Sequence, residues 1–320
     1  MSVRPMRGLN KPMAKQAAVS PFESSEKAVG DPSFLTRRSR RNRSLVWAKF
    51  RRNRLASASA VVVLVLILMA IFAPWVSLHN PLYIDMDHKF ATPGQAGFLL
   101  GADELGRDVF SRLLFAGRVS LAVGLMTALI AVVIGSVLGA LAGYYAGSID
   151  TVIMRFADVL LSMPTIFLLL ALSAFLKATL STIILIIGLN SWMPVARLVR
   201  GQILSIKQQE YILAARALGA NDRRLIFQQL LPNASAPVLV AATLSVANAI
   251  LTESSLSYLG YGIQPPTASW GNMLNNAQAY VLYAPWVAVY PGVMITLTVL
   301  GFNFAGDGLR DALDPRLSLH

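Results

Sequence analysis

Long hydrophobic runs with few or no charged residues alternate with short polar stretches along this chain. Each of six runs is close to the roughly 20 apolar residues that a helix needs to cross a bilayer. Pro164 is expected to kink the third run, and the fourth contains Asn190 and Pro194. We therefore predict an all-α polytopic membrane protein with six transmembrane helices, at residues 55–76, 119–143, 159–176, 178–196, 237–260 and 286–306.

The polar stretch 207–232 has the pattern of a helical hairpin rather than a span. Its first part is rich in good helix formers, and Gly219 supplies the left-handed residue that commonly ends a helix. Asn221 or Asp222 can cap a second helix, which Pro232 is expected to end because proline has no N–H to donate. A water-facing hairpin between spans indicates a docking surface for a soluble partner. The stretch is charged throughout, at Lys207, Glu210, Arg216, Asp222, Arg223 and Arg224.

Two other connections carry polar patterns. Residues 101–118 resemble an amphipathic interfacial helix, for which Asp103 and Asp108 are candidate N-caps. Residues 144–158 are expected to form a short polar connection, containing Asp150 and Asp158.

The composition agrees with a membrane protein, and the distribution of charge along the chain predicts how the protein is oriented in the membrane. The chain is 55% hydrophobic and 14% charged, whereas an ordinary soluble domain carries about 25% charged residues. Residues 1–54 hold 14 of the 28 Lys and Arg and 3 of the 16 Asp and Glu. We expect a disordered arm at 1–36 and a basic amphipathic segment at 37–54 on the inner leaflet. Beside a span, this basic arm is better explained as an orientation signal than as a nucleic-acid-binding segment.

Counting basic residues predicts which loops are cytoplasmic. With the N-terminus inside, 23 Lys and Arg residues lie inside and five lie outside, which is the bias expected of a correct orientation. Residues 55–118 then form the first span and an outer loop, and residues 119–308 form a core with the other five spans. Both termini, the hairpin and the tail at 309–320 are predicted to be cytoplasmic. The five outer residues are Lys89, Arg107, Arg112, Arg118 and Lys177.

The sequence offers little catalytic chemistry. Each lysine follows a residue other than glycine, so the Gly-Lys pair of a phosphate-binding loop is absent. The chain has no cysteine, and its histidines, His79, His88 and His320, are too scattered to suggest a metal cluster. We therefore predict no catalytic site, no metal site and no cofactor bound by this chain.

Glu253 is the most unusual residue within a predicted span. An ionised side chain at the bilayer centre costs at least ~2.5 kcal/mol, so such groups usually face the bundle interior or water. One hypothesis is that Glu253 lines or gates a pathway. The other is that it hydrogen-bonds to its neighbours Thr252, Ser254 or Ser255.

The hairpin has alternative interpretations. Two helices joined by a glycine-containing turn also describe a helix-turn-helix DNA reader. However, the flanking spans start close by, which leaves no third helix to form a core. An inert loop would not need two capped helices or the small pair Ala214–Ala215, which permits close approach of another surface.

The hairpin and three longer stretches resemble a known family. Ala214, Ala215, Gly219 and the pair Leu231 and Pro232 match the Glu-Ala-Ala…Gly…Leu-Pro loop of binding-protein-dependent ABC transporter permeases. Residues 100–121, 253–271 and 301–316 resemble the second permease subunit of dipeptide, oligopeptide and nickel importers, and the whole resemblance covers about 37–320.

The resemblance implies a permease of the bacterial inner membrane with four kinds of partner. These are a paralogous permease, two cytoplasmic ATPase subunits that hold ATP and Mg, an extracytoplasmic substrate-binding protein and the lipid membrane. Leu213 departs from the family, which commonly has Glu there, and Glu210, one turn earlier, is the nearest acid. The residues expected to couple to the ATPase are Glu210, Ala214, Ala215, Gly219, Asp222, Leu231 and Pro232.

Dipeptides or oligopeptides are the expected substrates from this subfamily, with nickel or another small solute as the alternative. A self-sufficient channel or secondary transporter would need paired intramembrane charges or an inverted repeat. Glu253 is the one clear intramembrane acid, so this class is less well supported.

Overall fold

The computed structural model describes residues 47–313. The chain divides into two compact units, Met1–Ala48 and Lys49–His320. The predicted arm at 1–36, most of the segment at 37–54 and the last part of the tail lie outside the described residues. Residues 47–52 of the basic segment are helical.

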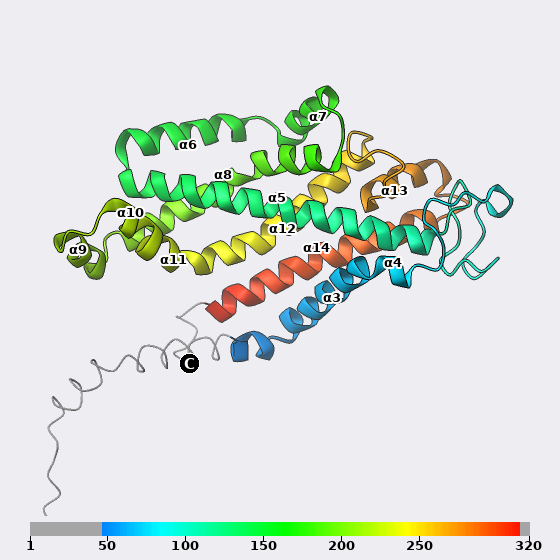
Figure 1. The fold of residues 1–320 in the computed structure, drawn as a ribbon, viewed down its shortest axis with the longest axis horizontal. Coiled ribbons are helices and arrows are strands. Elements are labelled where there is room, and N and C mark those ends of the chain that lie inside the picture. The colour runs from blue at the N-terminus through cyan, green and yellow to red at the C-terminus, as the bar shows by residue number, and fades with distance from the viewer. Residues whose placement is uncertain (1–46, 314–320) are drawn as a thin grey trace, which may run out of the picture. The chain divides into compact units, whose positions relative to one another are not determined.

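The described residues are almost wholly helical, and the predicted fold class is confirmed (Figure 1). Five helices are long and apolar enough to cross a membrane: α3, α5, α8, α12 and α14. The pair α6 and α7 gives a sixth crossing if it counts as one broken span. The helices are α3 (Arg54–Ile71), α4 (Ala73–Val76), α5 (Val109–Tyr145), α6 (Gly147–Ser162), α7 (Thr165–Phe175), α8 (Leu180–Ile206), α9 (Glu210–Ala217), α10 (Asp222–Arg224), α11 (Leu231–Asn233), α12 (Ser235–Tyr258), α13 (Trp270–Ala277) and α14 (Trp286–Leu313), with short 3-10 helices η1 (Met86–His88) and η3 (Gln278–Tyr280) and a π-helix η2 (Leu225–Leu230).

The third predicted span differs most from the structure. The expected connection at 144–158 is wrong, because α6 occupies most of it and continues to Ser162. Pro164 does more than kink a span, since α6 and α7 meet at 86°. Asp150 and Asp158 lie on α6 because they pair with α8: Arg200 donates to both oxygens of Asp150 at 2.5 and 2.6 Å, and Arg197 donates to Asp158 at 2.5 Å.

Helix α5 is one continuous helix of 37 residues, so the separate interfacial helix predicted at 101–118 is wrong. At 1.5 Å per residue α5 is about 55 Å long, which exceeds the ~30 Å hydrocarbon core. Asp108 is its N-cap, as predicted, and accepts from the backbone N–H groups of Phe110 and Ser111. Asp103 does not cap a helix. It is buried and binds Arg107 at 2.8 Å and Arg112 at 3.3 Å.

The centre of the bundle is the contact between α5 and α8, which depends on three glycines of α5. A Cβ atom at Gly135 would lie 2.7 Å from the carbonyl oxygen of Trp192, and one at Gly143 would lie 2.9 Å from that of Arg200. Gly139, between them, is closer still to α8. Small residues at four-residue spacing allow membrane helices to approach closely, and this spacing does so here.

The last helix is longer than predicted. Helix α14 runs to Leu313 rather than ending near Gly306, so 309–313 continue the helix instead of starting a tail. Gly306 faces Thr243 of α12 and Gly308 faces Ala56 of α3, so both glycines lie at helix contacts rather than at a helix end. Figure 1 shows the 207–232 segment at one end of the long helices and residues 77–108 at the other.

Candidate functional site: the 207–232 hairpin

The hairpin forms as predicted in its first half, with a shorter first helix. Helix α8 ends at Ile206 with Lys207 as its C-cap, and α9 starts at Glu210. Gly219 has φ +84°, and its N–H donates to Arg216 while that of Ala220 donates to Ala215, both at about 3 Å. This is the Schellman arrangement, which satisfies the last carbonyls of α9.

The second half begins as predicted but ends differently. Asn221, one of the two candidate caps, is the N-cap of α10, and its side chain accepts from the N–H of Arg224 at 2.9 Å. Pro232 does not end the helical segment, because a π-helix at 225–230 precedes it and α11 and α12 follow. Proline removes one backbone donor, and a π-turn is one way in which a helix accommodates the changed hydrogen bonding.

Tyr144, at the end of α5, holds the hairpin to the bundle. Its hydroxyl donates to Asp222 at 2.5 Å and accepts from Arg216 at 3.0 Å. Lys207 donates to the backbone oxygen of Tyr144, and the cations of Lys207 and Arg216 both lie 5.4 Å from its ring centre. Tyr144 was not predictable as a site residue, because nothing in the pattern of α5 distinguishes it from an interfacial aromatic.

Apolar packing also fixes the hairpin. Ile212 from α9 and Leu225, Ile226 and Leu230 from the π-helix are buried in one cluster with residues of α8. The hairpin is therefore attached to α5 and α8 as a rigid extension rather than as a mobile loop. The α8 residues in this cluster are Val195, Val199, Ile203 and Ile206.

The outer surface of the hairpin is open and partly apolar. Ala214 is exposed and Ala215 is half-buried, while Leu213 is 54% and Leu218 is 88% exposed. Glu210 lies in the first turn of α9, exposed and without an ion pair among residues 47–313. Leu231 is half-buried and Pro232 exposed. A hollow of about 630 Å³ lies beside α10 and is lined by Asn221, Arg223, Arg224, Phe227 and Gln228.

Glu253 lies fully buried within the chain. It accepts hydrogen bonds from the hydroxyls of Ser257 at 2.7 Å and Ser120 at 3.3 Å. Ser120 also accepts from the backbone N–H of Trp270, so the carboxylate links α12, α5 and the start of α13. This geometry favours the hydrogen-bonding hypothesis, with partners other than the neighbours expected from the sequence, and gives Glu253 no exposed surface toward a pathway.

The segment at 77–108 places two histidines beside aspartates, and Nδ1 of His79 lies 3.4 Å from Oδ2 of Asp108. Asp85 caps η1 and accepts from His88 at 2.8 Å, which lowers the pKa of the Asp85 carboxyl. A carboxyl with a lowered pKa is a poor general acid at neutral pH. Between residues 47 and 313, no three His, Asp or Glu side chains converge as metal ligands would.

Comparisons with known proteins agree over most of the chain. Residues 135–319 match the model of the binding-protein-dependent transport system inner membrane component, and residues 43–93 match the N-terminal transmembrane domain of oligopeptide transport permease C. The oligopeptide transport system permease protein OppC of Bacillus subtilis is 38% identical over 296 residues, which are 92% of this chain and 97% of that protein.

A second relative and a solved structure support the same assignment. The glutathione transport system permease protein GsiD of Escherichia coli is 44% identical over 272 residues, covering 85% of this chain and 89% of the relative. An inward-facing structure of the MetNI methionine ABC transporter has a chain with a TM-score of 0.54 and 21% identity, covering 64% of this chain and 98% of that one. At that identity the match concerns the fold.

Proposed function

The chain belongs to the family of binding-protein-dependent transport system inner membrane components, and from this premise we propose that it carries short peptides across the bacterial inner membrane. It does so as one of two permease subunits that enclose the translocation pathway. Its similarity to oligopeptide and glutathione permeases supports a peptide substrate, since both named substrates are peptides. A second, paralogous permease completes the pathway.

The hairpin at 207–232 is the proposed contact with a cytoplasmic ATPase subunit. The observation that carries this proposal is the combination of an exposed apolar tip with a rigid base. Leu213 and Leu218 present apolar surface, while Tyr144 and the buried cluster fix the hairpin to α5 and α8. A force applied at the tip is therefore transmitted to two spans, as a switching transition requires.

The remaining parts of the proposal follow from this placement. The hairpin end of the bundle faces the cytoplasm, together with both termini, as the excess of basic residues indicates. The loop at 77–108 faces outward, where an extracytoplasmic binding protein delivers the peptide. ATP and Mg are bound by the partner ATPase subunits, and this chain contributes no catalytic site.

Uptake by the purified complex tests the proposal. The chain is co-expressed with its second permease, ATPase and binding-protein subunits and reconstituted in liposomes, and ATP-dependent entry of labelled di- to pentapeptides is measured. We expect uptake that needs ATP and the binding protein. Failure of the ATPase subunits to co-purify, or uptake of nickel but of no peptide, would overturn the proposal.

Gly219 provides a matched pair of variants for the same assay. Valine resists the positive φ of this position, whereas asparagine adopts it. A Cβ at Gly219 would meet no atom within 4 Å, so the two variants differ in backbone preference and not in clashes. Gly219→Val should lose ATPase retention and uptake, and Gly219→Asn should keep both.

A further inference from the structure

Helix α12 presents a stripe of polar side chains on a face that the rest of the chain leaves open. Ser245, Asn248, Thr252 and Ser255 recur at three- and four-residue spacing, which places them on one helix face. Asn248 and Ser255 are exposed, and Ser245 and Thr252 are half-buried. Each hydroxyl donates to the carbonyl four residues earlier, at 2.7 to 2.8 Å.

Asn248 differs from the three hydroxyl residues because its side chain has no hydrogen bond among residues 47–313. It lies near the middle of α12, between Ser235 and Tyr258. Leaving an amide without a hydrogen bond in hydrocarbon costs several kcal/mol. The position of Asn248 therefore indicates that this face meets water or another polar group rather than lipid.

The exposed face of α5 shows the opposite character. Its outward side chains through the middle of the helix are apolar, as expected of a surface in contact with lipid. Two helices of the same bundle thus present two kinds of surface to their surroundings. Through the middle of α5, the exposed residues are Leu125, Met126, Leu129, Val133 and Val137.

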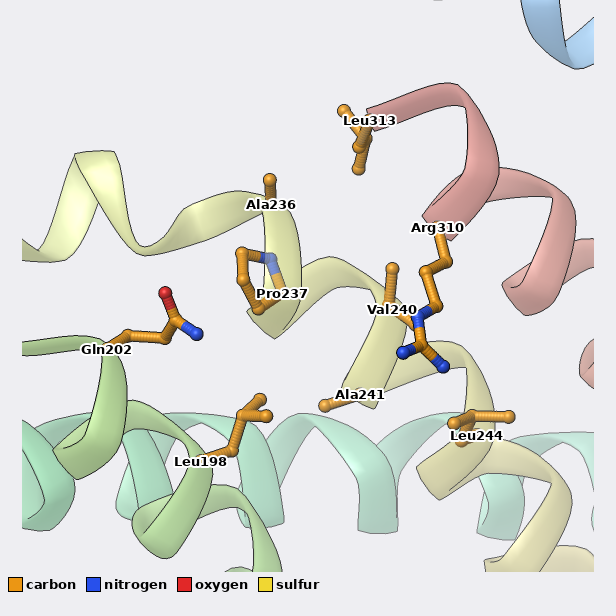
Figure 2. Close-up of a pocket in the computed structure, with 9 residues that line it drawn as sticks. All are labelled: Leu198, Gln202, Ala236, Pro237, Val240, Ala241, Leu244, Arg310 and Leu313. Carbon is orange, nitrogen blue, oxygen red and sulfur yellow. The ribbon is translucent and has the colours of Figure 1, made fainter. Parts of the chain in front are cut away.

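The polar stripe continues into a cavity at the hairpin end of α12. Ala241 lies one turn before Ser245 and lines a cavity of about 600 Å³ between α8, α12 and α14 (Figure 2). Most of the lining is apolar, with Gln202 from α8 and Arg310 from α14 as its polar groups. Figure 2 shows Arg310 extending from α14 toward Val240 and Leu244. The cavity and the stripe together form one surface that runs from the hairpin end of α12 to Ser255.

We propose that this surface of α12 lines the translocation pathway and that the amide of Asn248 hydrogen-bonds the backbone of the passing peptide. The inference rests on the proposed function and identifies the group that contacts its substrate. A primary amide both donates and accepts, so it can pair with the N–H and C=O groups that every peptide carries. Such a contact suits a transporter whose substrates share a backbone and differ in side chains.

Thiol accessibility tests whether the stripe faces water. Asn248→Cys and Ser255→Cys are compared with Leu129→Cys in the complete complex, since the chain has no native cysteine. A charged methanethiosulfonate reagent is applied to membranes without nucleotide and with ATP and vanadate. We expect Asn248→Cys to react at least about tenfold faster than Leu129→Cys in one state or both. The thiolate is the reactive form, and it forms readily in water, whereas apolar surroundings raise the pKa of the thiol. Equal, slow reaction in both states would overturn the proposal.

Uptake kinetics test the contact with the peptide. Asn248→Leu removes the amide at similar size, and Asn248→Gln keeps it. Because a hydrogen bond is worth about 0.5–1.5 kcal/mol, Asn248→Leu should lower peptide uptake by up to about tenfold while ATPase retention stays unchanged. Asn248→Gln should retain more activity than Asn248→Leu.

The outcomes separate this inference from the proposed function. If the unaltered complex takes up no peptide, the proposed function fails, and the thiol data still decide whether the stripe faces water. If the unaltered complex transports peptide and Asn248→Leu transports equally well, the peptide contact is wrong. If Asn248→Leu prevents assembly with the second permease, Asn248 lies in a subunit interface and the proposal is overturned.

Discussion

Single side chains fix the relation between the membrane helices and the surface on which a partner would act. Tyr144 is the clearest case, because one phenol contacts Asp222, Arg216 and Lys207 from three parts of the hairpin. Glu253 has a similar role in the half of the bundle away from the hairpin, where one carboxylate joins α12 to Ser120 of α5. Both residues act as links between elements, and both can be altered by one atom or one functional group.

Tyr144→Phe removes the hydroxyl and keeps the ring. The hydroxyl makes two hydrogen bonds to charged groups, each worth about 1.5–3 kcal/mol in favourable cases, so we expect the hairpin to open more often. Hydrogen exchange of backbone amides in 210–224 should accelerate by about tenfold or more, while the long helices stay protected. Tyr145→Phe is the control, because Tyr145 is 46% exposed and makes no hydrogen bond through its hydroxyl among residues 47–313. Unchanged exchange in Tyr144→Phe would contradict the anchoring role.

Glu253→Gln should leave transport close to normal. The amide keeps one acceptor oxygen, and a serine hydroxyl can rotate to accept from the new N–H group. Glu253→Leu should instead lower thermal stability, since Ser120 and Ser257 lose their acceptor and an unsatisfied buried group costs about 1–3 kcal/mol. The measurements are uptake and thermal unfolding of the purified complex. Loss of uptake in an assembled Glu253→Gln complex would show that the carboxylate itself takes part in transport.

At the scale of elements, the pattern of hydrophobic runs predicts most spans, and local chemistry explains where it fails. The runs predict α3, α8, α12 and α14 because an apolar stretch of sufficient length has few alternatives to forming a membrane-spanning helix. The charges in 144–158 suggested a loop, but Asp150 and Asp158 are helical because arginines of α8 neutralise them. A single sequence does not show which charged residues of different helices form ion pairs. It also does not show that Tyr144 lies beside Asp222.

The contact between α5 and α8 gives a prediction at this scale. Gly139→Ala places a methyl group against the backbone of Ala196, and overpacking of this kind costs about 1–3 kcal/mol. The thermal midpoint of the complex should fall. Gly201→Ala on α8 is the matched control, because a Cβ there meets no atom within 4 Å and alanine favours a helix by about 0.5–1 kcal/mol. Equal midpoints for the two variants would mean that the glycines do not determine the helix contact.

For the molecule as a whole, the proposed function requires that opposite ends of the bundle face opposite sides of the membrane. The family and the fold were predictable from the sequence because several motifs occur in the right order over most of the chain. The polar stripe of α12 was not found, since serine, threonine and asparagine within an apolar run do not interrupt it. The structure shows that these residues share an exposed face.

Single cysteines at Lys89, Gln278 and Arg223 test the orientation in cells that produce the protein. An impermeant thiol reagent should label positions 89 and 278 from outside and should label 223 only after the membrane is opened. This expectation rests on the excess of basic residues on the hairpin side of the membrane. Labelling of position 223 in intact cells would reverse the assignment.

Site-specific photocrosslinking tests whether the hairpin docks on an ATPase subunit, as proposed. A benzophenone amino acid is placed at Leu218, which is 88% exposed at the tip of the hairpin, and at Phe175, which is 89% exposed at the end of α7. We expect position 218 to form a covalent adduct with the ATPase subunit in the assembled transporter, and position 175 to form none. Absence of that adduct at position 218, in complexes that still contain the ATPase and hydrolyse ATP, would show that the hairpin is not the docking site.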